Sequence, residues 1–229
     1  MIQRPVPRRT RNGSTHWRIF AGGLALLALS TYPPSAIAQV DYTGPAVVPP
    51  SEAYVGGASG DPALSLPRWQ TNSEKERTIW VHFTDPPPER PDFWEETVRA
   101  MEAWNVIGGI PLAFRNTGHT RAADVKFRWI RRFEAHQAGT TDWESDGEGW
   151  LSSAVVTLAT QHEGGTPMSD EFIRMVALHE LGHVIGLPHS DDPTDVMHPG
   201  NRNMIISDRD IRSARQLYQR LGSEKVSVP

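Results

Sequence analysis

The feature that most constrains this chain is a short segment that carries three histidines at fixed spacing, His179, His183 and His189. The segment lies in a run of residues typical of a helix that begins after Ser169. Residues four apart in a helix stand one turn apart on the same face, so the imidazoles of His179 and His183 can reach a single ion. Gly186 can adopt a positive φ, which would turn the chain and bring His189 to that ion as a third ligand.

This donor set predicts a catalytic zinc site rather than a structural one. Three neutral imidazoles leave one coordination position open, whereas a structural zinc is closed by four protein ligands. Glu180 lies about 100° round the helix from His179, so it can accept a proton from water without binding the ion. Zinc is a redox-silent Lewis acid, which suits the hydrolysis of peptide bonds.

Two other interpretations of the motif remain open. Asp191, Asp192 or Glu224 could replace His189 as the third ligand, although His189 has the better spacing. The chain could also be a catalytically silent zinc-binding module of the same fold. Such a module would be expected to lack Glu180 or one histidine, and all of them are present.

The hydrophobic pattern upstream of the motif predicts an α+β fold. Apolar residues alternate over 79–83, which indicates a strand with one buried face. Asp92, with Glu95 three residues later, predicts the capping box of an amphipathic helix over 92–107. Further strands are expected before the histidine-bearing helix, at 112–114, 125–129 and 154–159.

The N-terminal part of the chain is predicted to be an export signal followed by a leader. Residues 1–38 combine arginines, an apolar stretch over 19–30 and Ala36-Ile37-Ala38, a pattern typical of a cleaved signal peptide. The apolar stretch is shorter than the ~20 residues that span a bilayer. We therefore expect export to the periplasm or beyond, with no membrane anchor. Residues 39–68 are rich in Pro and Gly and predict a flexible leader, with the globular domain at 69–229.

Composition excludes several kinds of function. The formal net charge of −4 offers no basic surface for nucleic acid. Removal of residues 1–38 would take away only arginines among the charged residues, which makes the remainder more acidic. The sequence has no cysteine, so disulfides, thiolate catalysis and cysteine-bound metals are excluded.

The run from His179 to His189, HELGHVIGLPH, resembles the zinc-binding signature of the metzincin zinc metallopeptidases. Ser190 and the following DDPTDVMHP are similar to the matrixins (peptidase family M10). The resemblance implies a zinc-dependent endopeptidase that acts on protein or peptide substrates, with Glu180 as general base and Met197 as an apolar floor beneath the zinc. Latency by a cysteine switch is excluded, because the chain has no cysteine.

The resemblance also implies an architecture for residues 69–229, the metallopeptidase catalytic domain. This is a metzincin-like zincin: a twisted mixed sheet of about five strands with two long helices, then a small C-terminal lobe with the Met-turn and a closing helix over 207–221. The edge strand of the substrate cleft is expected in the last β-like run before the zinc helix, at Ala154, Val155 and Val156. The alternative is an interior strand with both edges paired.

We expect a monomer with one catalytic zinc ion. The acidic segment 142–148 offers an alternative as a Ca²⁺ site, but Glu144 and Ser153 depart from the pattern of a calcium loop at its third and twelfth positions. A solvated acidic turn is the simpler interpretation of this segment.

Overall fold

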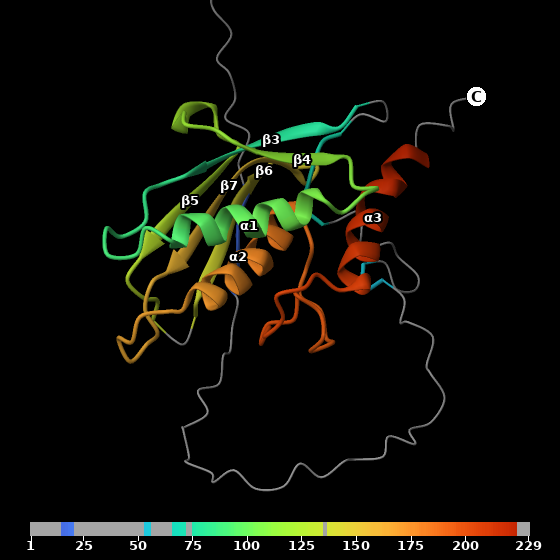
Figure 1. The fold of residues 1–229 in the computed structure, drawn as a ribbon. Coiled ribbons are helices and arrows are strands. Elements are labelled where there is room, and N and C mark those ends of the chain that lie inside the picture. Colours follow the sequence, from blue (N-terminus) through green and yellow to red (C-terminus); the bar gives the residue numbers. More distant parts are fainter. Residues whose placement is uncertain (1–14, 21–52, 56–65, 72–74, 135–136, 224–229) are drawn as a thin grey trace, which may run out of the picture.

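The computed structural model describes residues 15–20, 53–55, 66–71, 75–134 and 137–223 (Figure 1). In chain order its strands and helices are β1 (Thr15–Phe20), β2 (Arg68–Trp69), β3 (Arg77–Phe83), α1 (Phe93–Asn105), β4 (Leu112–Asn116), β5 (Val125–Ile130), β6 (Gly139–Ser145), β7 (Trp150–Ala159), α2 (Asp170–Ile185) and α3 (Asp208–Ser223). A short 3-10 turn, Thr120–Ala122, precedes β5.

The strands form one mixed sheet, in the order β1-β6-β7-β5-β3-β4, with the short β2 paired to β7. Strands β3, β4, β5 and β7 run parallel, whereas β6 runs antiparallel to β7 and β1 antiparallel to β6. The alternation seen over 79–83 is reproduced, with Ile79, Val81 and Phe83 buried in the core. The predicted α+β class and mixed sheet are confirmed.

The structure corrects the expected position of the substrate strand. Ala154, Val155 and Val156 lie in β7, and each has a partner in β5 on one side and in β6 on the other. The prediction that these residues form a sheet edge is therefore wrong. Side-chain alternation reports which faces of a strand are buried, and it carries no information on whether the backbone of the strand is paired on both sides.

Helices α1 and α2 lie together on one face of the sheet, whereas α3 lies to the side of this layer (Figure 1). Trp104 of α1 is buried and donates its indole N–H to the carbonyl of Leu178 in α2 at 3.0 Å. The capping box predicted for α1 does not form, because the carboxylate of Asp92 accepts the guanidinium N–H groups of Arg90 instead. Arg90 also pairs with Asp170, so it links the first turns of the two helices.

Two aromatic side chains satisfy carbonyls at the end of α2. The last four carbonyls of a helix have no partner inside the helix. The indole N–H of Trp69 donates to the carbonyl of Val184 at 2.8 Å, and the hydroxyl of Tyr218 donates to that of Ile185 at 2.7 Å. The helix that carries the histidine motif is thus tied to both the start of the domain and α3.

Part of the predicted leader is docked on the domain. Tyr54 donates its backbone N–H to Ser213 at 3.0 Å and its hydroxyl to Asp210 at 2.9 Å, and Val55 is buried. The expectation of a flexible leader is wrong for these two residues and for Arg68, which is buried and pairs with Trp150 of β7. Most of the remaining leader, and residues 1–14 and 21–38 of the predicted signal, lie outside the described residues.

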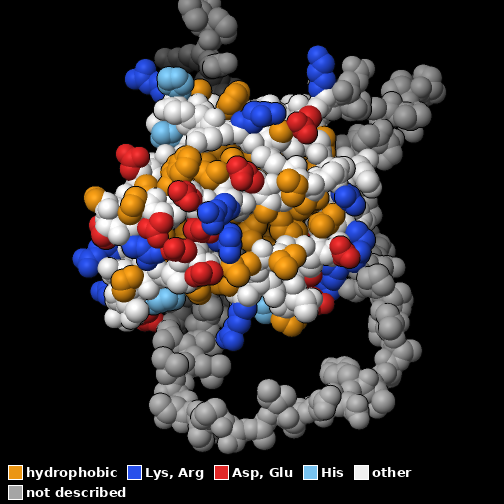
Figure 2. Space-filling model, in the orientation of Figure 1, with side chains coloured by type: hydrophobic (Ala, Val, Ile, Leu, Met, Phe, Trp, Pro, Cys, Tyr) orange, Lys and Arg blue, Asp and Glu red, His pale blue; other side chains and the backbone are white. Residues whose placement is uncertain are grey.

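The described residues contain no helix that is both long enough and apolar enough to cross a membrane. Figure 2 shows the face that carries α1, where apolar side chains lie among charged ones. On the surface, a hollow of about 550 Å³ is bordered by α1, α2 and the loop before α3, and its apolar lining includes Val106, Leu178, Met204 and Ile205. None of the three motif histidines lines it.

Candidate active site

The helix α2 has the two ends that the sequence predicts. Ser169 caps its start, because the hydroxyl accepts the backbone N–H of Phe172 at 3.2 Å. Gly186 ends it in the left-handed region, with φ of 109°. A side chain at this position would meet the carbonyl oxygen of Pro67 well inside van der Waals contact. The predicted positive φ at Gly186 is therefore confirmed, and the chain turns there toward His189.

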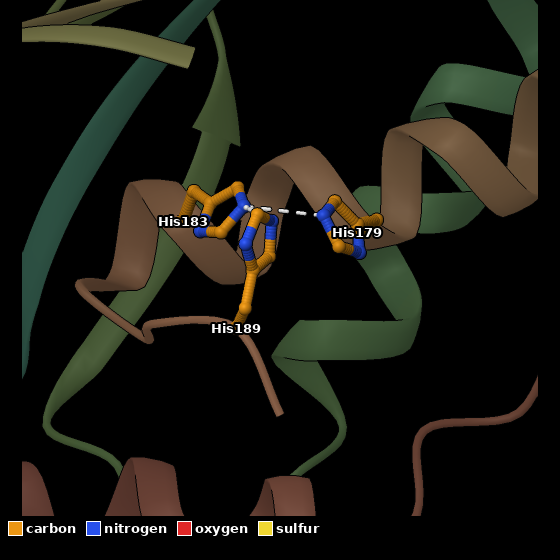
Figure 3. A group of neighbouring side chains, drawn as sticks. All are labelled: His179, His183 and His189. Atoms are coloured by element: carbon orange, nitrogen blue, oxygen red, sulfur yellow. Dashed lines mark hydrogen bonds between the residues drawn. The ribbon is translucent and has the colours of Figure 1, made fainter. Parts of the chain in front are cut away.

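The turn brings the three motif histidines together (Figure 3). The Nε2 atom of His183 lies 3.1 Å from Nε2 of His179 and 3.2 Å from Nε2 of His189. Two nitrogens bound to one tetrahedral zinc at ~2.0–2.1 Å stand about 3.3 Å apart. The spacing of the ring nitrogens therefore fits a single zinc ion.

Backbone carbonyls orient two of the rings. Nδ1 of His179 lies 2.7 Å from the carbonyl oxygen of Val196, and Nδ1 of His183 lies 2.8 Å from that of Leu187. Because a carbonyl can only accept, each Nδ1 carries the proton and each Nε2 presents a lone pair. Lone pairs that face one another at this distance repel, and a cation between them removes the repulsion.

Burial keeps the histidines neutral. His179 and His183 are buried, and His189 is half-buried. Burial lowers the pKa of His179 to about 4, and it also lowers the pKa values of His183 and His189. Neutral imidazole is the form that binds a metal, so the site is ready for a cation at neutral pH.

Glu180, next to the first histidine, is fully buried against strand β6. Its Oε2 accepts the hydroxyl of Thr141 at 2.7 Å, and its Oε1 has no hydrogen-bond partner within the described part of the chain. Burial raises the pKa of Glu180 to about 8, and the hydrogen bond from Thr141 opposes this rise. A zinc cation held by the neighbouring histidines would lower this pKa and favour the ionised carboxylate. Gly139, two residues before Thr141, leaves room for the carboxylate, because a Cβ there would stand 2.6 Å from Oε1.

Met197 is fully buried and packs against α2 at Gly182, between the first two histidines of the motif. A side chain at Gly182 would overlap the sulfur of Met197. The loop around Met197 also holds the third histidine, since the N–H of Ser190 donates to the carbonyl of Met197 at 2.9 Å. His198 accepts the N–H of Gly200 at 3.1 Å, as expected of a polar turn residue.

Two buried aspartates, whose role sequence reasoning missed, fix this loop. Asp210 of α3 accepts the N–H of Val196 at 2.8 Å and that of Ser207 at 3.0 Å. Asp195 accepts the hydroxyls of Ser190 and Ser207, and it pairs with Arg209. The carbonyl of Val196 orients His179, so Asp210 supports the histidine site through the backbone of Val196. The sequence signal for Asp210 was its place beside Asp208 in the first turn of α3, although acids suit any helix start.

Strand β6 supplies residues near the site that the hydrophobic pattern did not reveal. Thr141 contacts Glu180, and the ring of Trp143 lies 6.3 Å from that of His183 at an angle of 25°. The acidic residues of the 142–148 segment extend from β6 into its turn, where Asp146 accepts the N–H groups of Glu148 and Trp150 at 2.9 Å each. In the described ranges, His179, His183 and His189 form the one group whose ligand atoms could hold a metal ion.

A helix with two inward-facing imidazoles, a turn that adds a third and a buried carboxylate beside them define a metallopeptidase-type centre. Residues 68–219 match the matrixin family of peptidases, M10. The chain belongs to this family, whose members depend on zinc.

The chain is also similar to individual proteins that are named as metalloproteinases. The chain is 27% identical over 176 residues to metalloendoproteinase 1 of Glycine max, covering 67% of the chain and 53% of that protein. It is 35% identical over 187 residues to matrix metalloproteinase-16 of Homo sapiens, covering 68% of the chain and 28% of that protein. A shorter stretch of 48 residues is 48% identical to matrilysin of Felis catus. The chain thus spans about half or less of the length of these relatives.

Proposed function

We propose that this chain is a zinc-dependent endopeptidase in which His179, His183 and His189 hold the ion and Glu180 is the general base. The observation that supports this most strongly is the convergence of the three Nε2 atoms at a helix that also carries the buried Glu180. A zinc ion held there supplies a Lewis acid that polarises a peptide carbonyl and activates water for attack on it. Met197, packed against Gly182 under the motif, would form the apolar floor of this site.

In this proposal Glu180 accepts the proton of the attacking water and passes it to the leaving amine. Two features support that role. Glu180 directly follows His179 and lies about 100° round the helix from it, so its carboxylate could address a water on the ion without being a ligand. One of its oxygens is held by Thr141, while the other has no partner in the described ranges and is available to a proton.

We further propose that the substrate lies along β6. This strand contacts Glu180 through Thr141, so a peptide paired to its outer edge would pass beside the base. In the full chain that edge pairs with Thr15–Phe20, which belong to the predicted signal segment. Once that segment is cleaved, the edge offers backbone donors and acceptors to which an extended peptide can add as a further strand.

Export through residues 1–38 is part of the proposal. The mature enzyme would begin at Gln39, act in the periplasm or outside the cell and work as a monomer. Purified protein from the medium or periplasm, analysed by N-terminal sequencing, tests the cleavage site.

The decisive experiment compares Glu180→Ala with the matched control Glu148→Ala, an exposed glutamate in the turn after β6. Both variants, made in the protein that begins at Gln39, should bind one equivalent of zinc by elemental analysis. Glu180→Ala should lose peptide-library cleavage by several orders of magnitude, because no base then accepts the proton. Full cleavage by Glu180→Ala would refute the mechanism. A wild-type protein that binds zinc but cleaves nothing would favour the silent zinc-binding module.

Substrate pairing can be tested without changing the protein. A good substrate peptide is N-methylated at alternate backbone amides, in two complementary sets. The amides of a paired strand point alternately toward and away from its partner, so one set should weaken binding strongly and the other set little. Equal effects of both sets would contradict the pairing.

A further inference from the structure

We propose that Thr141 is a positioning residue that holds the carboxylate of Glu180 in its reactive orientation. The inference rests on the proposed function, because it assigns a support to the proposed base. Thr141 lies outside the histidine motif, in strand β6, 39 residues before Glu180 in the sequence.

The hydroxyl of Thr141 has two acceptors within reach, and they are not equivalent. Its Oγ1 lies 2.7 Å from Oε2 of Glu180 and 3.1 Å from the backbone carbonyl oxygen of the same residue. A hydroxyl donates one proton, and a carboxylate is the stronger acceptor. The backbone carbonyl of a residue inside a helix already accepts a hydrogen bond from the N–H four residues later. The proton of Thr141 therefore goes to the carboxylate.

Because both residues are buried, water cannot replace the hydrogen bond between them. Both side chains are fully buried, so no solvent competes for Oε2. A buried carboxylate that loses its donor keeps the full cost of desolvation, and its side chain is free to seek another partner. Glutamate has three side-chain torsions, and holding them before the reaction removes an ordering cost from the reacting state.

The second oxygen is confined by the same strand. Gly139 is on the same face of β6 as Thr141, since residues two apart in a strand face the same way. A Cβ at Gly139 would stand 2.6 Å from Oε1 and 2.9 Å from Cγ of Glu180. Thr141 thus anchors one oxygen by a hydrogen bond, and the missing side chain at Gly139 leaves space for the other. Because β6 is also the proposed substrate strand, base and peptide would be aligned by one element.

The test is a set of substitutions at Thr141 in the zinc-loaded protein that begins at Gln39. Thr141→Val keeps the shape and removes the hydroxyl, whereas Thr141→Ser keeps the hydroxyl. Thr141→Val should lower kcat by ~10- to 100-fold, the range typical for groups that orient the ligands of a metal site, with KM within about twofold. Thr141→Ser should recover most of kcat. Thr157→Val, which removes an equally buried strand hydroxyl bonded to Arg128, should leave kcat within about twofold of the wild type.

Coupling to Glu180 distinguishes positioning from general stabilisation. In the Glu180→Ala background, Thr141→Val should change the residual rate by less than twofold. In chelated protein, Thr141→Val should lower the urea midpoint when Glu180 is present and not when it is Ala. Should Thr141→Val fail to fold, Thr141→Ala replaces it. Gly139→Ala gives an independent check, with an expected loss of kcat and normal zinc content.

The outcomes separate the two proposals. Wild-type kcat in folded, zinc-loaded Thr141→Val overturns the role of Thr141, while an inactive Glu180→Ala would leave the proposed base intact. An equal loss in Thr141→Ser and Thr141→Val also overturns it, because the hydroxyl would then not matter. An active Glu180→Ala would instead refute the base itself.

Discussion

Gly186 joins the two parts of the histidine site, and its replacement by Ala tests how tightly that junction is built. Its φ of 109° is unfavourable for any residue with a Cβ. The new methyl group would also overlap the carbonyl oxygen of Pro67 and stand 3.1 Å from Cδ2 of Leu217. The oxygen is backbone, two residues before Trp69, whose indole is bonded to the end of α2. It therefore cannot move away as the tip of a flexible side chain could.

The expected cost follows from two separate effects. A left-handed backbone costs Ala about 1–2 kcal/mol, of which about 0.4–1 kcal/mol is regained because Ala restricts the unfolded chain. Overpacking against a fixed neighbour adds about 1–3 kcal/mol. We therefore expect Gly186→Ala to lower the free energy of unfolding by about 2–4 kcal/mol, or the melting temperature by about 5–15 °C for a domain of this size. Zinc affinity should fall as well, because the turn sets the position of His189.

Two other glycines allow the two effects to be measured separately. Gly165 has φ of 83° with no atom within 4 Å of an added Cβ, so Gly165→Ala reports the backbone effect alone. Gly108 also has open space, and its φ lies outside the left-handed region, so Gly108→Ala should be near neutral. The assay is urea unfolding of chelated protein followed by tryptophan fluorescence, with zinc titration in parallel. If Gly186→Ala and Gly165→Ala agree within about 0.5 kcal/mol, the close approach of Pro67 does not constrain the site and the reasoning is refuted.

Three further predictions concern the leader, an ion pair and the metal. Tyr54→Phe should lower the free energy of unfolding by about 1–2 kcal/mol, because the buried carboxylate of Asp210 loses a donor; an unchanged urea midpoint would show that this hydrogen bond contributes nothing to stability. The Arg90 guanidinium lowers the pKa of Asp92 to about 2, so their pairing stabilises the fold above about pH 4 and is lost as the pH falls toward 2. Arg90→Met should therefore lower the free energy of unfolding at pH 7 by at most about 1 kcal/mol, because the pair is open to solvent, and the difference from wild type should shrink at pH 2.5; a constant difference would contradict this. Chelation should abolish peptide cleavage and lower the melting temperature, and added zinc should restore both; cleavage that survives complete removal of metal would exclude a zinc mechanism.

The histidine site could be predicted from sequence because its geometry is almost entirely local. The positions of His179 and His183 follow from the helical period, and Gly186 sets the direction of the chain toward His189 within a few residues. The ends of α2 are equally local, with a serine cap at one end and a glycine at the other. Family resemblance added the peptidase class, and the match over residues 68–219 agrees with it.

Structural features that depend on contacts between distant parts of the chain could not be predicted from local sequence patterns. The docking of Tyr54 depends on Asp210, 156 residues later, and the segment around Tyr54 has no periodic pattern to signal it. The capping box at Asp92 was a sound local pattern, but a neighbouring arginine competes for the same carboxylate. In both places a tertiary contact determined the outcome.

Strand β6 shows why the substrate edge was assigned to the wrong strand. Its sequence, GTTDWES, lacks the run of apolar residues that makes β7 conspicuous, so the pattern pointed to β7 as the last strand before α2. Yet the inward face of β6 begins with Gly139 and Thr141, which lie against the buried carboxylate of Glu180, with Val176 also close to Gly139. A glycine fits where the carboxylate needs space, and a threonine fits where it needs a donor. The polar residues that break the hydrophobic alternation of β6 are therefore the residues that contact the proposed base. A short polar strand beside a metal-binding helix thus indicates a functional site, because departures from local sequence rules are expected there.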